Sequence, residues 1–265
     1  NTLASASGTQ NGCVSDPTPE NDPNAGVLEA VRERYARFAI GAAGRSDAYR
    51  EWAEGVAGDT DTQRVIARIP ENRRQAPLVF AVARMLGAPV GEYPALADWI
   101  SHHADALVAE TARRSLQTNE PQRTAVLLPA LADIPGPLAV IEVGASAGLW
   151  LIPDRYSYRY RGATAVDLGA GEPMLHAELR GGRAPARFSA MPEITWRAGI
   201  DLAPLSSENP ADRAFLIALV WPGEEGRDAR ITAALDAAAS HPPRIIAGDS
   251  TTPGVLAGLA DEARA

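Results

Sequence analysis

The sequence contains no lysine, a single cysteine and no long apolar run. All 25 basic residues among the 265 are arginine, which excludes chemistry that needs a lysine amine, such as a Schiff base or a phosphate-binding P-loop. Cys13 alone cannot form an internal disulfide or a thiolate metal site. No stretch approaches the roughly 18 to 20 apolar residues of a membrane-spanning helix. We therefore expect a cytoplasmic protein that does not enter a membrane, and we find no residues spaced like metal ligands.

Basic charge is also scarce relative to acidic charge. The formal net charge is −8 and the isoelectric point is about 5.1. This argues against a nucleic-acid-binding protein, because nucleic-acid affinity depends on basic surface. Apolar residues make up 46% of the chain, enough to bury a core as one large domain or two small ones. We expect the partner to be a small molecule.

The chain divides by composition. Residues 1–26 are rich in Asn, Pro, Ser, Thr and Gly and are predicted to form a flexible arm. Residues 27–134 carry apolar side chains at helical spacing, as at Val31 and Tyr35, and Ser46 stands where a helix N-cap is expected. This second part is predicted to be all helical.

Residues 135–265 alternate between strand and helix patterns. The segments LAVIEV, EITWRAGIDL and PRIIAGDS are predicted strands separated by helices, which indicates a parallel sheet of Rossmann-like α/β type. An insertion is expected at about 152–193, in which YSYRYRG alternates like an exposed strand and 162–190 is irregular. A doubly wound sheet normally has more strands than the three counted. We therefore expect the C-terminal strands of the fold to be missing from this chain.

The segment AVIEVGASAGLWL, residues 139–151, fits two patterns. Its centre reads G-x-S-x-G, the nucleophile elbow of a serine hydrolase, with Ser146 as the nucleophile. Histidines and aspartates that could complete a triad follow it in the chain. However, no oxyanion segment precedes it, and Glu142 stands where such enzymes usually have an apolar residue.

The same segment also reads as an acidic strand end followed by a nucleotide-binding glycine loop. Glu142 can bind a ligand's ammonium or ribose, or it can anchor the amides of the loop. Gly144 permits a tight turn, and Gly148 lets the following helix pack close to the strand. Ala145 and Ser146 lie between these two glycines.

Two later acids strengthen the nucleotide interpretation. Asp201 ends the strand of GIDLAPL, and its two acceptor oxygens match a ribose diol. Asp249 ends the next strand and can accept from an adenine amino group. The carboxyl ends of parallel strands meet at one edge, where open α/β sheets bind ligands. The alternative is that each aspartate is a helix cap or a turn former.

A polar stretch, LQTNEPQR, precedes the predicted sheet. Asn119, Glu120 and Arg123 are expected to line the substrate side, with Arg123 gripping a carboxylate. The alternative is a capping cluster at the start of a helix.

The segments IEVGASAGLWL, GIDLAPL and AGD resemble the first three motifs of class I methyltransferases that use S-adenosylmethionine (SAM). Nearly the whole chain resembles domain-of-unknown-function family 2332, an uncharacterised bacterial family. This second resemblance is carried by RERYARFA, GRSDAYREWAEGVAGD, SLQTNEPQRTAVLLPAL, IEVGASAGLWLIPDRYSYRY, WRAGIDLAPL and LVWPGEE. It implies a methyltransferase-like Rossmann fold behind a helical region. SAM is then the expected cofactor, and methyl transfer to a small molecule is the expected reaction.

Other functions stay open. Ser146 replaces the central glycine of the methyltransferase loop, which suits a nucleotide-binding protein without catalysis. The serine hydrolase is a second alternative. An enzyme that uses NAD(P) is a third, although GASAG is a poor match to G-x-G-x-x-G.

Overall fold

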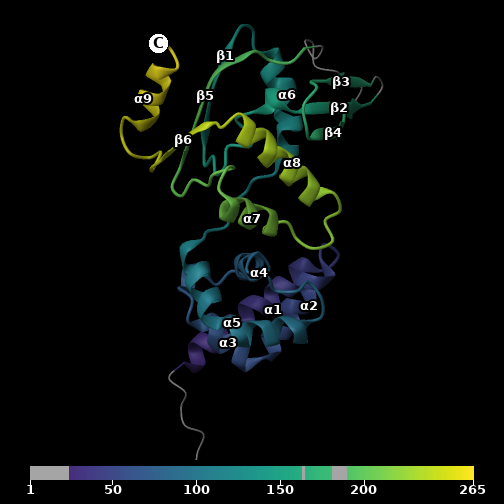
Figure 1. Cartoon of the computed structure of the whole chain (residues 1–265), viewed down its shortest axis with the longest axis vertical. Coiled ribbons are helices and arrows are strands. Elements are labelled where there is room, and N and C mark those ends of the chain that lie inside the picture. The colour runs from purple at the N-terminus through teal and green to yellow at the C-terminus, as the bar shows by residue number, and fades with distance from the viewer. Residues whose placement is uncertain (1–23, 163–164, 181–189) are drawn as a thin grey trace, which may run out of the picture.

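The computed structural model describes residues 24–162, 165–180 and 190–265 (Figure 1). Helices between residues 25 and 113 form one lobe, and two small sheets with further helices form the other. The fold is therefore mixed α/β, as predicted. The flexible arm predicted for residues 1–26 lies almost wholly outside the described residues, and the first helix begins at Ala25.

The helical lobe follows the apolar spacing of the sequence. Its elements are α1 (Ala25–Ala42), α2 (Asp47–Gly58), α3 (Thr60–Ala67), η1 (Glu71–Arg73), α4 (Ala76–Met85) and α5 (Tyr93–Arg113). η2 (Pro121–Arg123) and α6 (Thr124–Asp133) follow in the chain but lie in the other lobe, where Ala125 and Leu128 of α6 are part of its core (Figure 1). Ser46 caps α2 as predicted, because its side chain accepts from the Tyr49 N–H at 3.3 Å. Aromatic side chains such as Tyr49, Trp52 and Phe80 are fully buried in one core.

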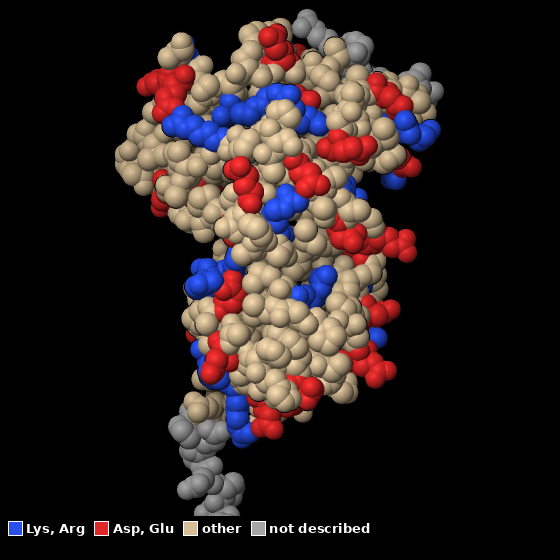
Figure 2. Space-filling view, viewed as in Figure 1, with Lys and Arg blue, Asp and Glu red and all other residues tan. Residues whose placement is uncertain are grey.

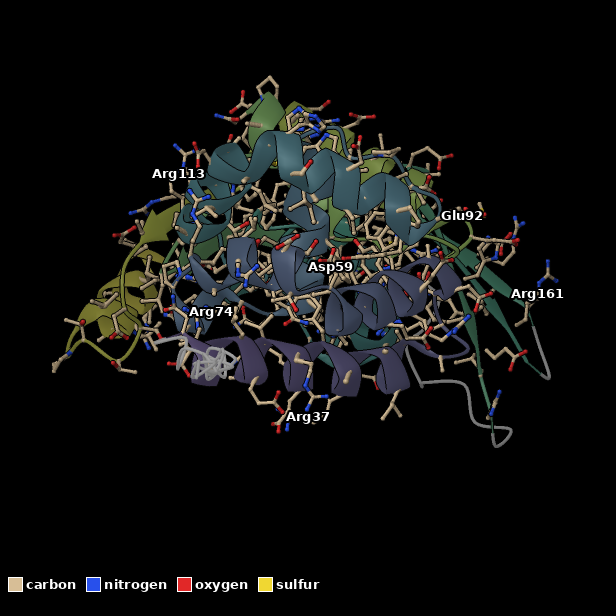
Figure 3. All side chains as sticks on the ribbon, turned by 90° about the horizontal axis from the view of Figure 1, so that it is seen from below. Arg37, Asp59, Arg74, Glu92, Arg113 and Arg161 are labelled. Carbon is tan, nitrogen blue, oxygen red and sulfur yellow. The ribbon has the colours of Figure 1, made fainter. Side chains whose placement is uncertain are left out.

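Apolar spacing does not predict α3, which begins at a local N-cap. Asp59 accepts hydrogen bonds from the N–H groups of Asp61 at 2.9 Å and Thr62 at 3.2 Å. The Tyr93 hydroxyl donates to the other oxygen of the Asp59 carboxylate at 2.7 Å. Figure 3, seen from below, places Asp59 among the helices of this lobe. The cap therefore starts α3 and also ties it to α5.

The three predicted core strands are confirmed, and they form one parallel sheet. β1 (Leu138–Val143), β5 (Ile194–Asp201) and β6 (Arg244–Ala247) lie in the order β1-β5-β6. Glu142 lies opposite Gly199 in the register. Since alternate residues of a strand face the same side, Glu142 and Asp201 lie on the same face of the sheet.

The expectation that residues 162–190 are irregular is wrong for the part of this segment that the structure describes. β2 (Ser157–Arg161), β3 (Val166–Leu168) and β4 (Met174–Glu178) form a second sheet in the order β3-β2-β4. The strand YSYRYRG is not exposed either, because its tyrosines are buried. The Tyr158 hydroxyl donates to the Pro153 carbonyl and the Tyr160 hydroxyl to the Ala125 carbonyl, both at 2.7 Å. β3 and β4 form because they pair with β2, and β4 also packs on α6. The local sequence pattern shows neither contact.

The remaining helices are α7 (Pro210–Ala218), α8 (Arg227–Ser240) and α9 (Val255–Glu262). α7 joins the two lobes (Figure 1), because Phe215 packs in the helical core and Leu216 in the core between the second sheet, α6 and α8. Arg84 of α4 donates to the carbonyls of Ala218 at 2.9 Å and Val220 at 2.5 Å. Ala218 is the last residue of α7 and Val220 lies two residues beyond it, so the arginine satisfies acceptors that the end of the helix leaves unpaired.

Two glycines of α2 give a matched test of this packing. A Cβ at Gly55 would lie 2.1 Å from Cγ of Tyr93, whereas a Cβ at Gly58 would meet nothing within 4 Å. We expect Gly55→Ala to lower the free energy of unfolding by about 1 to 3 kcal/mol through overpacking. Gly58→Ala should raise it by about 0.5 kcal/mol, since alanine favours helix. Urea unfolding of both variants measures the difference, and equal effects would contradict the packing described.

Candidate functional site

The loops after the three parallel strands meet at one edge of the sheet. The Gly144 N–H, at the end of β1, donates to the Ile200 carbonyl at 2.8 Å. The Gly248 N–H, at the end of β6, donates to the Asp201 carbonyl at 2.9 Å. The end of β5 therefore holds both neighbouring loops, so the ends of all three strands adjoin at this edge.

The Asp201 carboxylate binds the backbone of two loops. Its Oδ2 accepts from the Ser146 N–H at 2.8 Å, and its Oδ1 accepts from the Ala203 N–H at 2.8 Å. Each carboxylate oxygen has a second lone pair, so both oxygens can accept one more donor. Asp201 is thus both a structural anchor of the edge and an available acceptor.

Ser146 adopts an unusual backbone conformation. Its φ is +51°, and it is the only non-glycine residue with positive φ in the described part of the chain. The side chain is 1% exposed, and the Asn119 amide donates to its hydroxyl oxygen. The Ser146 carbonyl accepts from the Leu205 N–H at 3.1 Å. With its N–H bound to Asp201, every polar group of Ser146 has a hydrogen-bond partner outside the glycine loop.

Glu142 is the least compensated acid of the edge. Its Oε2 is buried and has no hydrogen-bond partner in the described residues. Burial raises the pKa of Glu142 to about 8, and the nearby charge of Asp201 adds to the effect. A buried acceptor without a donor is costly, and a second carboxylate on the same face increases that cost.

Small residues let the loop pack directly on the sheet. A Cβ at Gly199 would lie 2.4 Å from that of Ala145, and a Cβ at Gly148 would lie 2.5 Å from Cγ of Pro243. No α-helix follows Gly148: turns lead to η3 (Pro153–Arg155), so the helix expected there is absent. Gly148 is needed for close approach to β6 and not to a helix.

Asp249 lies at the same edge but is exposed. Its Oδ1 accepts from the N–H and the hydroxyl of Thr251, at 2.8 and 2.7 Å. Hydrogen bonding to Thr251 holds the pKa of Asp249 below its usual value. The turn-forming role considered for this residue is therefore present in the structure.

The structure separates the roles of Asn119, Glu120 and Arg123. Asn119 is buried and contacts the loop through Ser146. Arg123 is exposed, and its guanidinium lies 5.4 Å from the ring centre of Trp150. Within residues 24–162, 165–180 and 190–265, no carboxylate lies within 4 Å of the Arg123 nitrogens. Arg123 therefore stays available for an anion.

Glu120 instead forms ion pairs with α8. Arg230 donates to Oε1 at 3.0 Å, and Nε of Arg227 lies 2.5 Å from Oε2 without hydrogen-bond geometry. Burial raises the pKa of Glu120, but hydrogen bonds from Arg230 and the Gln122 N–H outweigh it, so the pKa is lowered overall. Sequence reasoning missed these arginines, because nothing local connects residues about a hundred positions apart.

A serine hydrolase needs a general base beside Ser146, and no histidine in the described residues is hydrogen-bonded to it. All four histidines lie in the described residues. His176 is exposed on β4, and His241 is exposed after α8.

Cavities lie near the edge and also away from it. Two clefts of about 290 Å³ each flank the segment Ala203–Leu205, one of them bordered by Ala147 and the other by Gln117. A cavity of about 660 Å³ lies elsewhere, between Gly171 of the β3–β4 turn and the C-terminal part of α8. On the face shown in Figure 2, acidic and basic side chains are interspersed, with one band of arginine near the top.

The described residues contain neither a candidate metal centre nor a candidate membrane-spanning helix. No group of three or more His, Cys, Asp or Glu side chains in them is arranged to hold a metal ion. No helix among them is both long and apolar enough to cross a membrane.

The fold and the edge define a mixed α/β protein with a parallel three-stranded sheet and acids at the strand ends. The chain belongs to a family described as "Uncharacterized protein conserved in bacteria (DUF2332)", which matches residues 32–263. Comparisons with curated proteins and with solved structures each found no match.

The raised pKa of Glu142 predicts a pH dependence of stability. Between pH 4.5 and about 8 the folded protein keeps a proton on Glu142 that the unfolded chain releases. Stability therefore falls as the pH rises through this window, by up to ~1.4 kcal/mol per pH unit from this group. Glu142→Gln should remove that component. Urea unfolding of both proteins at several pH values tests this, and parallel curves would contradict it.

Proposed function

We propose that this protein binds SAM at the carboxyl ends of β1, β5 and β6 and transfers its methyl group to a small molecule. The sheet order supports a Rossmann-like half-sheet: the three strands are neighbours in the order in which they occur along the chain. In such sheets the ligand lies outside the carboxyl ends of the strands.

The observation that carries the proposal is the unpartnered, buried Oε2 of Glu142 on the same face as Asp201. Two neighbouring carboxyl groups favour a ligand that brings positive charge and hydrogen-bond donors. SAM carries both, in its ammonium group and its ribose hydroxyls. Glu142 is assigned to the ammonium and Asp201 to the ribose diol.

The loop fits this ligand in part. Gly144 has a φ of +76°, and a Cβ there would meet nothing within 4 Å, so a ligand can approach its backbone. Ser146 is turned away, because its N–H binds Asp201 and its side chain is buried. Asp249 is exposed at the end of β6 and is assigned to the adenine amino group.

Methyl transfer needs little from the protein beyond orientation. When bound, SAM supplies an electrophilic methyl group. Glu142 and Asp201 would hold the ammonium and the ribose, which lie on either side of the methyl-bearing sulfur, so that a bound acceptor lies in line with the breaking bond. Arg123 has no carboxylate partner in the described residues and is assigned to an anionic group of the acceptor.

The serine hydrolase is the second candidate, favoured by the positive φ of Ser146 within G-x-S-x-G after a strand. Its hydroxyl is buried and bound by Asn119. The methyltransferase proposal is therefore preferred.

Calorimetric titration of the full chain with S-adenosylhomocysteine tests the proposal. We expect micromolar binding, weakened about 10- to 100-fold by Glu142→Gln and by Asp201→Asn, as for loss of a charged hydrogen bond. Glu33→Gln is the matched control, because Glu33 is an exposed acid of α1 that pairs with Arg37 at 3.7 Å. No binding at millimolar ligand overturns the proposal, and labelling of Ser146 by a fluorophosphonate would then decide the hydrolase alternative.

We also predict that ligand binding releases a proton from Glu142, which the same titration can measure. The empty protein keeps Glu142 protonated below about pH 8, whereas an ammonium ligand binds the carboxylate. Affinity should rise about tenfold per pH unit from roughly pH 6 to 8, because binding expels one proton. Titrations in two buffers with different ionisation enthalpies count the proton. Glu142→Gln should abolish the release, and an unchanged proton count in that variant would assign the titration to another group.

A further inference from the structure

We propose that Asn119 is a positioning residue, which holds the glycine loop in its ligand-binding shape by gripping the side chain of Ser146. The ligand used to test this rests on the proposed function. The structural claim concerns only the segment around Asn119 and the loop from Gly144 to Gly148.

The backbone of Ser146 gives the first reason. A positive φ costs a non-glycine residue roughly 1–2 kcal/mol, and glycine avoids this cost. The bonds to Asp201 and to the Leu205 N–H use only the backbone of Ser146, so any residue at this position could form them. The hydroxyl contact with Asn119 is the one bond that requires a side chain. The hydrogen bond from Asn119 therefore explains why position 146 carries a serine and not a glycine.

The anchoring of the segment around Asn119 gives the second reason. The Gln117 side chain donates to the Ala203 carbonyl at 3.4 Å. On the other side, the Glu120 carbonyl accepts from Nε1 of Trp150 at 3.1 Å, and its carboxylate pairs with α8. Asn119 is thus held between two anchored neighbours and is 8% exposed. Its amide has a fixed position from which to hold Ser146.

The contact links two parts of the molecule. The segment with Asn119 runs between α5 of the helical lobe and α6 (Figure 1). Ser146 in turn holds Asp201 through its N–H. A displacement of the segment would therefore reach the carboxylate assigned to the ribose. Asn119 acts on the ligand through Ser146 and not by touching it.

A double-mutant cycle tests this role. In Ser146→Gly the positive φ carries no cost, so the loop no longer needs Asn119. We expect Asn119→Ala to weaken S-adenosylhomocysteine binding about tenfold in the wild-type background and less than twofold in the Ser146→Gly background. A tenfold loss in both backgrounds would overturn the proposal and place Asn119 in contact with the ligand.

Amide hydrogen exchange of peptides that cover residues 144–151 gives a readout without ligand. Exchange should accelerate at least severalfold in Asn119→Ala, and Asn119→Ala should add no acceleration to Ser146→Gly. Asn119→Asp, which can accept from the serine hydroxyl, should keep most of the protection and also serves if the alanine variant does not fold. Unchanged exchange in Asn119→Ala overturns the positioning role. If the wild type binds no ligand but this exchange pattern holds, the proposed function fails and the positioning role stands.

Discussion

The hydrogen bond from the Ser146 N–H to Asp201 is the interaction on which the strand-end edge depends. It closes the loop after β1 onto the end of β5, while the second oxygen of Asp201 holds the Ala203 N–H. Gly199 makes this closure possible, since a Cβ there would overlap Ala145. One carboxylate thereby sets the shape of two loops. A ligand that binds Asp201 must fit the positions these loops leave open.

Charge balance distinguishes Glu142 from the structural acids near it. Asp154 pairs with Arg197 through two hydrogen bonds, at 2.6 and 2.9 Å, and Glu120 pairs with arginines of α8. Those acids gain enough from their partners to be buried. Glu142 has no such partner in the described residues, and its pKa rises instead. Strongly perturbed pKa values are concentrated at functional sites, which makes Glu142 the candidate for ligand contact among these acids.

Side chains from one lobe pack or form hydrogen bonds in the other. α7 contributes Phe215 to one core and Leu216 to the other, and Arg84 crosses from the helical lobe to the end of α7. Segment 117–120 makes a second crossing, which ends at the glycine loop. The helical lobe is therefore connected to the edge through the chain itself and through the hydrogen bonds of segment 117–120.

The sequence by itself determined most helices, the three parallel strands and the grouping of acids at their ends. These follow from apolar periodicity, caps such as Ser46, and the rule that parallel strands end at a common edge. Only the tertiary structure decided that β3 and β4 form, that no helix follows Gly148, and that the Glu120 carboxylate forms ion pairs with arginines of α8. It also decided that Asn119 holds Ser146. Each of these depends on pairing between segments far apart in the chain, and local propensity carries no information about such partners.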